Sequence, residues 1–180
     1  EILQVFYPDY TKEEFDKVFH TNVYEDEKVL NVVTNHKKRF DDLFIEKTKP
    51  EHFFPFAKKL LDDLSQRYNL YIISGAPTHC LINHLNLIDS VSKFEKILGA
   101  DVARSKVERF NMLIEEYKLN KENIMFITDS LGDINEATEV GLKSLGVTWG
   151  VHNSNTLSKG NPHKIFSDFK ELKEFINEEF

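Results

Sequence analysis

The sequence has one cysteine, no long apolar run and no long basic run. Cys80 cannot form a disulfide within the chain, so we expect a reducing, cytoplasmic setting. No stretch of about 18 apolar residues occurs, which predicts that the chain does not span a membrane. The net charge is −7. An acidic chain without a basic run argues against nucleic acid or an anionic membrane as the main partner.

Glycine is absent from residues 1–49, and proline occurs there once. Thr11 and Glu14 have the spacing of a capping box, and apolar residues at helical spacing follow them. A second helical pattern covers Asp26–Lys47, with a break expected near Thr34–Asn35. We therefore predict a small helical unit over residues 1–49.

From residue 50 the pattern changes to short apolar runs that alternate with amphipathic segments. This alternation predicts an α/β core over residues 50–180, with a doubly wound parallel sheet covered by helices. The expected strands are Leu70–Ser74, Lys96–Ala100, Ile124–Thr128, Ser144–Thr148 and Lys164–Phe166. The expected helices are Glu51–Tyr68, Thr78–Ile88, Ser105–Tyr117, Ile134–Val140 (ended by Gly141) and Phe169–Phe180.

Two carboxylates follow the strong apolar run Ile124–Thr128. In doubly wound sheets, ligands bind beyond the carboxyl ends of the strands. The short loop between Asp129 and Asp133 can bring both side chains to that edge, where two hard oxygen ligands suit Mg²⁺. The alternative is that Asp129 only ends a strand and Asp133 only caps a helix.

A hydroxyl and a small-residue turn end another expected strand, at Ser74, Gly75 and Ala76. Free backbone amides in this turn and at the start of the next helix would suit an anion. The alternative is an ordinary turn between strand and helix. Lys106 opens a later helix, where a cation opposes the helix dipole unless an anion offsets it. Arg104 is a competing candidate, and a solvated Lys106 is the alternative.

Together these residues resemble the motifs of the haloacid dehalogenase superfamily, in particular its phosphoglycolate-phosphatase-like branch. YIISGAP resembles the second motif, RSKVERF the third and FITDSLGDINEA the fourth, with Thr128 in place of the usual glycine. The resemblance implies that Ser74 and Lys106 bind the transferring phosphoryl group. It also implies that Asp129 binds Mg²⁺ directly, whereas Asp133 acts partly through water and orients Lys106.

The family's first motif, DxDx[TV], which carries the nucleophile and the acid/base, does not occur in these 180 residues. One alternative is a degenerate motif in which Tyr7 and Asp9 follow a strand at ILQVF. We instead expect the first strand and its aspartates to lie upstream of Glu1. Without that strand, Leu70–Ser74 and Ile124–Thr128 must pair directly or leave two open sheet edges.

The resemblance implies Mg²⁺-dependent hydrolysis of a small phosphorylated metabolite through an aspartyl-phosphate. It also implies that the helical unit of residues 1–49 is an N-terminal cap, which selects the leaving group. The chain as given would be inactive alone, because the nucleophile is missing. One alternative is a non-catalytic relative that binds phosphate and Mg²⁺. Another is a dehalogenase, which works without Mg²⁺ and which the Asp129 and Asp133 pair disfavours.

The remaining candidate ligands give no metal pattern. The seven histidines lack the HxH or HxxxH spacing of a zinc site. We expect His79 at the surface and Cys80 as a buried structural thiol.

Overall fold

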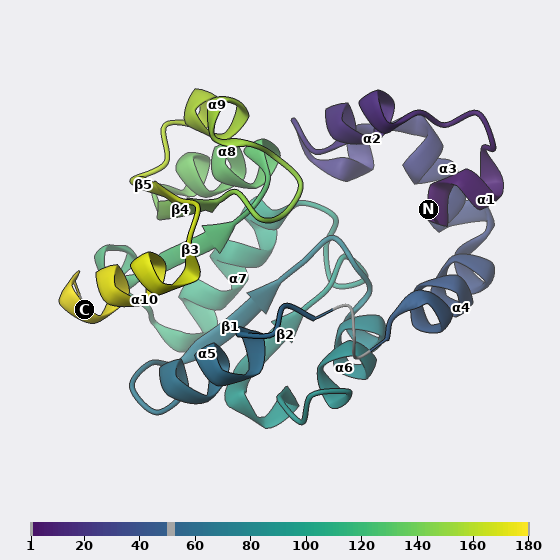
Figure 1. The fold of residues 1–180 in the computed structure, drawn as a ribbon. Coiled ribbons are helices and arrows are strands. Elements are labelled where there is room, and N and C mark those ends of the chain that lie inside the picture. Colours follow the sequence, from purple (N-terminus) through teal and green to yellow (C-terminus); the bar gives the residue numbers. More distant parts are fainter. Residues whose placement is uncertain (1, 50–52, 180) are drawn as a thin grey trace. The chain divides into compact units, whose positions relative to one another are not determined.

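The structure is a computed structural model, and it describes residues 2–49 and 53–179 (Figure 1). The chain forms two compact units. The first unit comprises residues 1–8 and 28–104, and the second comprises residues 9–27 and 105–180. Each unit joins helices from the first 49 residues to strands from the rest. These units are defined by contacts between segments and do not show whether residues 1–49 form a separate cap. The predicted boundary after residue 49 therefore stays a prediction.

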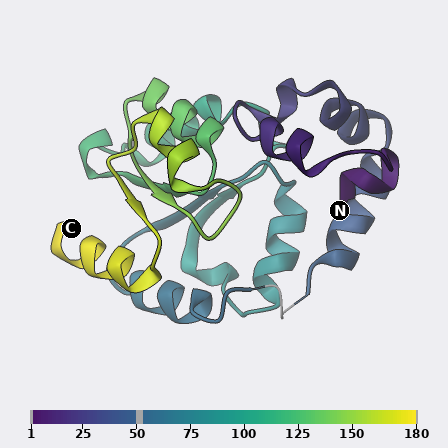
Figure 2. The ribbon, with the colours of Figure 1, turned by 45° about the horizontal axis from the view of Figure 1, so that its top comes forward.

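The first unit contains a pair of parallel strands with a crossover helix. In this unit α6 contacts both β2 and α4 (Figure 2). The break expected near Thr34–Asn35 is confirmed, because α3 ends at Asn35 and α4 begins at Lys37. The elements of the first unit are α1 (Ile2–Phe6), α3 (Glu27–Asn35), α4 (Lys37–Lys47), α5 (Ala57–Leu64), β1 (Leu70–Ile73), α6 (Thr78–Asn86), η3 (Val91–Lys93) and β2 (Phe94–Leu98).

The second unit contains three parallel strands in the order β3–β4–β5. Its core includes side chains that are fully buried on α8, on β4 and on α9, namely Ile134, Leu145 and Leu157. The elements of the second unit are α2 (Lys12–Val18), η1 (Val23–Glu25), α7 (Lys106–Tyr117), η4 (Lys121–Asn123), β3 (Met125–Thr128), α8 (Leu131–Val140), β4 (Lys143–Val147), α9 (Ser154–Leu157), η5 (Ser158–Gly160), β5 (Lys164–Phe166) and α10 (Phe169–Glu179).

Local sequence signals account for several helix ends. The Thr11 hydroxyl accepts from Glu14 N at 3.1 Å, and Glu14 Oε2 accepts from Thr11 N at 2.8 Å, so the predicted capping box forms. Gly141 ends α8 with φ at 78°, as expected of a glycine in the left-handed region. By contrast, α5 is shorter than the predicted Glu51–Tyr68. Pro55 disfavours helix just before it, and Glu51 and His52 lie outside the described residues.

The predicted α/β class with parallel strands is confirmed, but the strands form two sheets. β1 pairs with β2, and β3 pairs with β4, so β1 and β3 are edge strands of separate sheets. The sequence analysis expected these two strands either to pair directly or to leave open edges. The described residues show no pairing between β1 and β3. Ile127 in β3 is 38% exposed, which is high for an isoleucine in the middle of a strand.

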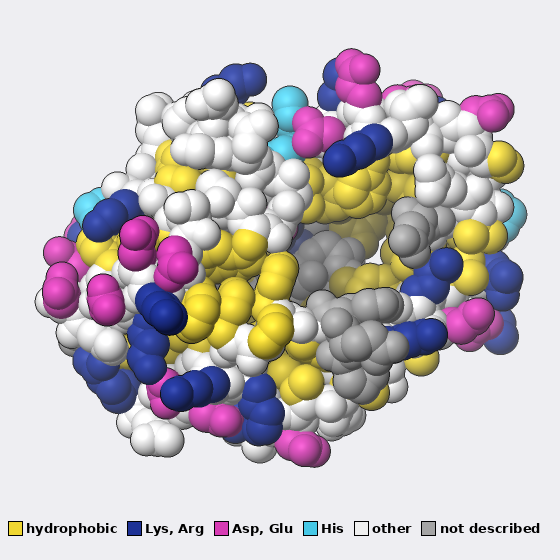
Figure 3. All heavy atoms as spheres, in the orientation of Figure 1, with side chains coloured by type: hydrophobic (Ala, Val, Ile, Leu, Met, Phe, Trp, Pro, Cys, Tyr) yellow, Lys and Arg dark blue, Asp and Glu magenta, His cyan; other side chains and the backbone are white. Residues whose placement is uncertain are grey.

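On the face in Figure 3, acidic and basic side chains are interspersed, and no broad field of one sign covers it. None of the helices in the described part of the chain has the length and hydropathy that a membrane crossing requires.

Candidate phosphate and metal site

A buried ion pair joins the first turns of α7 and α8 in the second unit. Lys106 Nζ lies 2.5 Å from Asp133 Oδ1, and the two side chains are 7% and 19% exposed. The hydroxyl of Thr128 donates to Asp133 Oδ2 at 2.8 Å. Both oxygens of Asp133 are therefore engaged, and the ammonium group of Lys106 is held in a fixed place. Arg104, the competing candidate, is exposed.

A second carboxylate stabilises the start of α7. Glu136 is 9% exposed, and its Oε1 accepts from Lys106 N at 2.8 Å and from Asn22 Nδ2 at 3.0 Å. Its negative charge at the helix N-terminus offsets the unfavourable position of the lysine. A bound anion is thus not needed to explain why Lys106 opens a helix. The sequence analysis did not single out Glu136, although it lies three residues after Asp133 and so shares its helix face.

Asp129 directly follows β3 and is held by the loop after β4. Its Oδ2 accepts from Val151 N at 2.8 Å, and its backbone carbonyl accepts from His152 N at 3.1 Å. A Cβ atom at Gly150 would overlap with Asp129 Oδ2, so only glycine permits this approach. Oδ1 of Asp129 has no hydrogen-bond donor among residues 2–49 and 53–179.

These oxygens are compatible with the Mg²⁺ site that the motif implies. Mg²⁺ commonly takes only one or two carboxylates and keeps several waters. Asp129 has one oxygen left for a metal, whereas Asp133 uses both of its oxygens for Lys106 and Thr128. The donor set therefore fits a role for Asp129 as a direct ligand and for Asp133 as a partner of Lys106.

The turn after β1 carries the other predicted site residues, Ser74, Gly75 and Ala76, and it lies in the first unit. The hydroxyl of Ser74 accepts from Ala76 N at 3.2 Å. The first amide of α6, Thr78 N, donates to Asp101 Oδ1 at 2.6 Å. The chain's own carboxylate thus already occupies the helix start that was expected to receive an anion. Burial raises the pKa of Asp101, but its hydrogen bonds from Thr78 outweigh this and the pKa is lowered.

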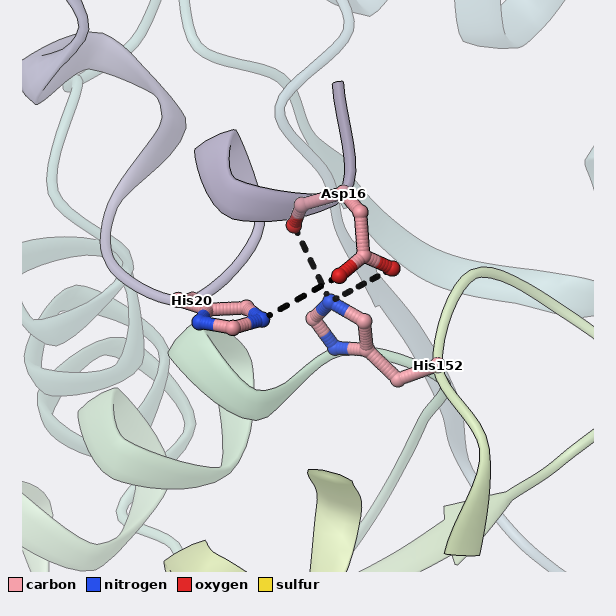
Figure 4. Close-up of side chains that lie close together, drawn as sticks. All are labelled: Asp16, His20 and His152. Atoms are coloured by element: carbon pink, nitrogen blue, oxygen red, sulfur yellow. Dashed lines mark hydrogen bonds and ion pairs between the residues drawn. The ribbon is translucent and has the colours of Figure 1, made fainter. Parts of the chain in front are cut away.

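His152 links the loop after β4, which holds Asp129, to α2 within the second unit (Figure 4). Its Nδ1 accepts from Leu131 N at 2.9 Å, so this nitrogen carries no proton. The proton of the neutral ring is then on Nε2, which lies 3.1 Å from the carbonyl oxygen of Asp16 and donates to it. Asp16 also lies 3.4 Å from His20 Nε2.

This arrangement bears on whether Asp16, His20 and His152 could hold a metal. Their ligand atoms lie within 4.8 Å of one another. However, both nitrogens of His152 are already used, one as acceptor and one as donor, and its side chain is fully buried. We therefore interpret the cluster as a group of hydrogen-bonded residues that stabilises the loop after β4, which in turn holds Asp129. No sequence pattern could reveal it, because Asp16 and His152 are 136 residues apart.

Comparison with known proteins agrees with the motifs. The family model described as haloacid dehalogenase-like hydrolase matches residues 1–147. Among curated proteins, the chain is 24% identical over 145 residues to phosphoglycolate phosphatase from Vibrio parahaemolyticus, covering 78% of this chain and 64% of that protein. It is 29% identical over 130 residues to phosphoglycolate phosphatase from Photorhabdus laumondii, covering 69% of this chain and 55% of that protein. The chain thus spans less than two thirds of the length of these relatives.

Solved structures share the fold. A structure described as a predicted phosphatase from Clostridium acetobutylicum has a TM-score of 0.74 at 22% identity, covering 93% of this chain and 76% of that one. A haloacid dehalogenase-like family hydrolase from Streptococcus pneumoniae has a TM-score of 0.69 at 21% identity, covering 98% of this chain and 76% of that one. The predicted resemblance to the superfamily and to its phosphoglycolate-phosphatase-like branch is confirmed.

Proposed function

This chain belongs to the haloacid dehalogenase-like hydrolase family, and on that premise we propose that it supplies the phosphate-binding and Mg²⁺-binding residues of a phosphatase for a small phosphomonoester. Relatives named phosphoglycolate phosphatase support this class of reaction, and phosphoglycolate is the first substrate to test. The observation that carries the proposal is the buried ion pair of Lys106 and Asp133. Asp133 lies four residues after Asp129 in the sequence.

Lys106 would stabilise negative charge on the transferring phosphoryl group. A buried ammonium whose position is fixed needs little reorganisation when charge develops beside it, which is the basis of electrostatic catalysis. Asp133 would hold that ammonium in place. Glu136 would fix the backbone from which the lysine side chain extends, since it accepts from Lys106 N.

Asp129 would be the direct carboxylate ligand of Mg²⁺. The bound ion would neutralise phosphate charge and polarise a phosphoryl oxygen. The bonds from Val151 N and His152 N hold Asp129 in place while leaving its Oδ1 available. The resemblance also assigns phosphate binding to Ser74, Gly75 and Ala76 in the turn after β1 of the first unit, and we propose this role separately from the site of Lys106 and Asp129.

The covalent step requires a carboxylate nucleophile, and no Asp-x-Asp pair occurs in the 180 residues. The degenerate alternative at Tyr7 and Asp9 requires a strand at ILQVF. That segment is the helix α1, and the hydroxyl of Tyr7 accepts from Asn31 Nδ2 at 2.8 Å. We therefore propose that these 180 residues bind phosphate and Mg²⁺ without forming an aspartyl-phosphate themselves.

A second candidate function is the binding of a small phosphorylated metabolite without its hydrolysis. Lys106 and Asp129 would bind the metabolite in that function. In either function a cytoplasmic setting suits the single, buried Cys80.

Two assays test these functions. Release of inorganic phosphate is measured from a panel of small phosphomonoesters that includes phosphoglycolate, with Mg²⁺ and with a chelator. Calorimetric binding of phosphate to the 180-residue chain is measured in parallel, with Lys106→Met and Asp129→Asn as variants. Mg²⁺-dependent binding that both variants lose supports the proposed site. Binding without turnover agrees with the proposed site in either function. Turnover by the 180-residue chain contradicts the proposal that it forms no aspartyl-phosphate, and an absence of binding contradicts the proposed site.

A further inference from the structure

Three potential metal ligands of different chemistry converge on the first unit. Asp41 comes from α4, and His79 and Cys80 come from the first turn of α6. One ligand atom from each residue lies within 4.8 Å of the other two. His79 Nε2 lies 3.2 Å from Asp41 Oδ2 and 3.4 Å from Cys80 Sγ. The two helices contact each other directly, so the group lies within one compact unit.

The carboxylate of Asp41 has an unused oxygen. Asp41 is 9% exposed, and its Oδ1 is buried without a hydrogen-bond partner in the described part of the chain. Lys37 Nζ lies 2.9 Å from the other oxygen, Oδ2. A buried carboxylate oxygen without a donor is unfavourable, because it has lost water and gained nothing in return. The same carboxylate group lies beside a thiol and an imidazole, and this combination is suited to a cation.

The donor set selects the class of cation. A thiolate, an imidazole and a carboxylate together suit Zn²⁺ and similar borderline-soft metals. Mg²⁺ and Ca²⁺ prefer oxygen ligands alone. Three protein ligands leave a fourth tetrahedral position for water. Sequence spacing did not reveal this group, since two of its members are adjacent and the third is 38 positions away.

From these observations, we propose that Asp41, His79 and Cys80 form a site for one divalent transition metal of the Zn²⁺ class. Binding would join the first turn of α6 to α4. It would also place the metal on the helix that begins just after the turn of Ser74, Gly75 and Ala76. The proposal does not depend on the proposed phosphatase function.

Binding at this site requires the loss of one proton. Burial, followed by the charge of Asp41, raises the pKa of the Cys80 thiol to about 11, so the metal-free site contains S–H at neutral pH. When the metal binds, the S–H bond breaks, the proton goes to water and a sulfur–metal bond forms. Lys37 and Asp101 are the other charged groups that act on this thiol.

A Co²⁺ titration of the full chain tests the site. Co²⁺ bound to a thiolate gives a charge-transfer band in the near ultraviolet, and Cys80 is the only cysteine in the sequence. We expect the band to saturate at one Co²⁺ per chain, to disappear on addition of Zn²⁺ and to persist in excess Mg²⁺. Cys80→Ser should abolish the band, and Asp41→Asn and His79→Gln should each weaken binding at least about tenfold.

Matched variants separate binding at this site from binding elsewhere on the chain. His163→Gln, at an exposed histidine of the second unit, should leave the titration unchanged. Lys37→Met should strengthen binding, because it removes the cation that competes for Asp41. Circular dichroism and a thermal transition confirm that each variant is folded. The proposal is overturned if the folded wild type shows no band. The proposal is also contradicted if both Asp41→Asn and His79→Gln leave the band unchanged, or if Lys37→Met does not strengthen binding.

Discussion

Lys106 Nζ and Asp133 Oδ1 lie 2.5 Å apart, and each residue is in the first turn of its own helix. The pair is largely buried, and Thr128 and Glu136 hold its two ends. In a partly buried site such a pair contributes more than a surface salt bridge, and removal of one partner leaves an uncompensated charge. This relationship holds the ammonium group of Lys106 in one place at the first turn of α8.

Lys106→Met should therefore destabilise the chain by roughly 2–4 kcal/mol, somewhat below the value for a fully buried pair because Asp133 is partly exposed. Urea unfolding of Lys106→Met, Asp133→Asn and the double variant measures the coupling between the two side chains. We expect a coupling energy of about 1–3 kcal/mol. A coupling indistinguishable from zero would show that the two charges do not stabilise each other.

Gly132→Ala should destabilise the second unit even though alanine favours helices. A Cβ at Gly132 would overlap with the carbonyl oxygen of Thr21, and Gly132 N donates to Phe19 O at 2.9 Å. We expect a loss above about 2 kcal/mol, because backbone must move and the gain in helix propensity is at most about 1 kcal/mol.

Gly141→Ala is the matched control on the same helix. It has open space around the Cβ position and a φ of 78°. Its cost should be about 1–2 kcal/mol, from the left-handed conformation alone. If thermal or urea unfolding shows that Gly132→Ala lowers stability no more than this control, the close contact between Thr21 and α8 is contradicted.

His152→Ala should destabilise the loop that holds Asp129. It leaves Leu131 N–H buried without an acceptor and removes the contact with Asp16, so we expect a loss of about 2–3 kcal/mol. His152→Asn keeps an acceptor near the position of Nδ1 and should lose less. Equal unfolding midpoints for the two variants would argue against the bond from Leu131 N to His152 Nδ1.

Asp101 should make stability depend on acid pH. Its pKa is lowered in the folded chain, so the stability it contributes is present above the ordinary value of 3.8 and is lost as pH falls through the lower, folded value. Asp101→Asn should reduce stability at pH 7 and flatten the loss of stability on acidification. Asp9→Asn, at an exposed position, is the control for urea midpoints measured across this range. A parallel acid response in both variants would contradict the role of Asp101.

The sequence predicted those features that local physics determines. The capping box at Thr11, the end of α8 at Gly141 and the parallel α/β pattern each depend on a few neighbouring residues or on hydrophobic spacing. The motif residues Lys106, Asp129 and Asp133 were also found, because they lie at recognisable strand and helix ends. Their roles with phosphate and Mg²⁺ remain predictions.

Features that depend on distant contacts could not be predicted in this way. Glu136 at the start of α7, Asp16 beneath His152 and Asp41 beside Cys80 acquire their roles from packing between segments far apart in the chain. The anion site expected after Ser74 stays a prediction, but the hydrogen bond at its helix start also depends on a distant contact. Asp101, which lies 23 residues after Thr78, supplies the carboxylate there.

Calorimetric titration of Mg²⁺ into the chain in the presence of phosphate, with Asp129→Asn as the comparison, tests the central claim most directly. Asparagine keeps an oxygen that can accept from Val151 N, so the variant changes the charge of the proposed ligand with little change of fold. We expect the wild type to bind one Mg²⁺ and the variant to bind at least about tenfold more weakly. Equal Mg²⁺ affinity in the two proteins, or no affinity in the wild type, would contradict the assignment of Asp129 as the metal ligand.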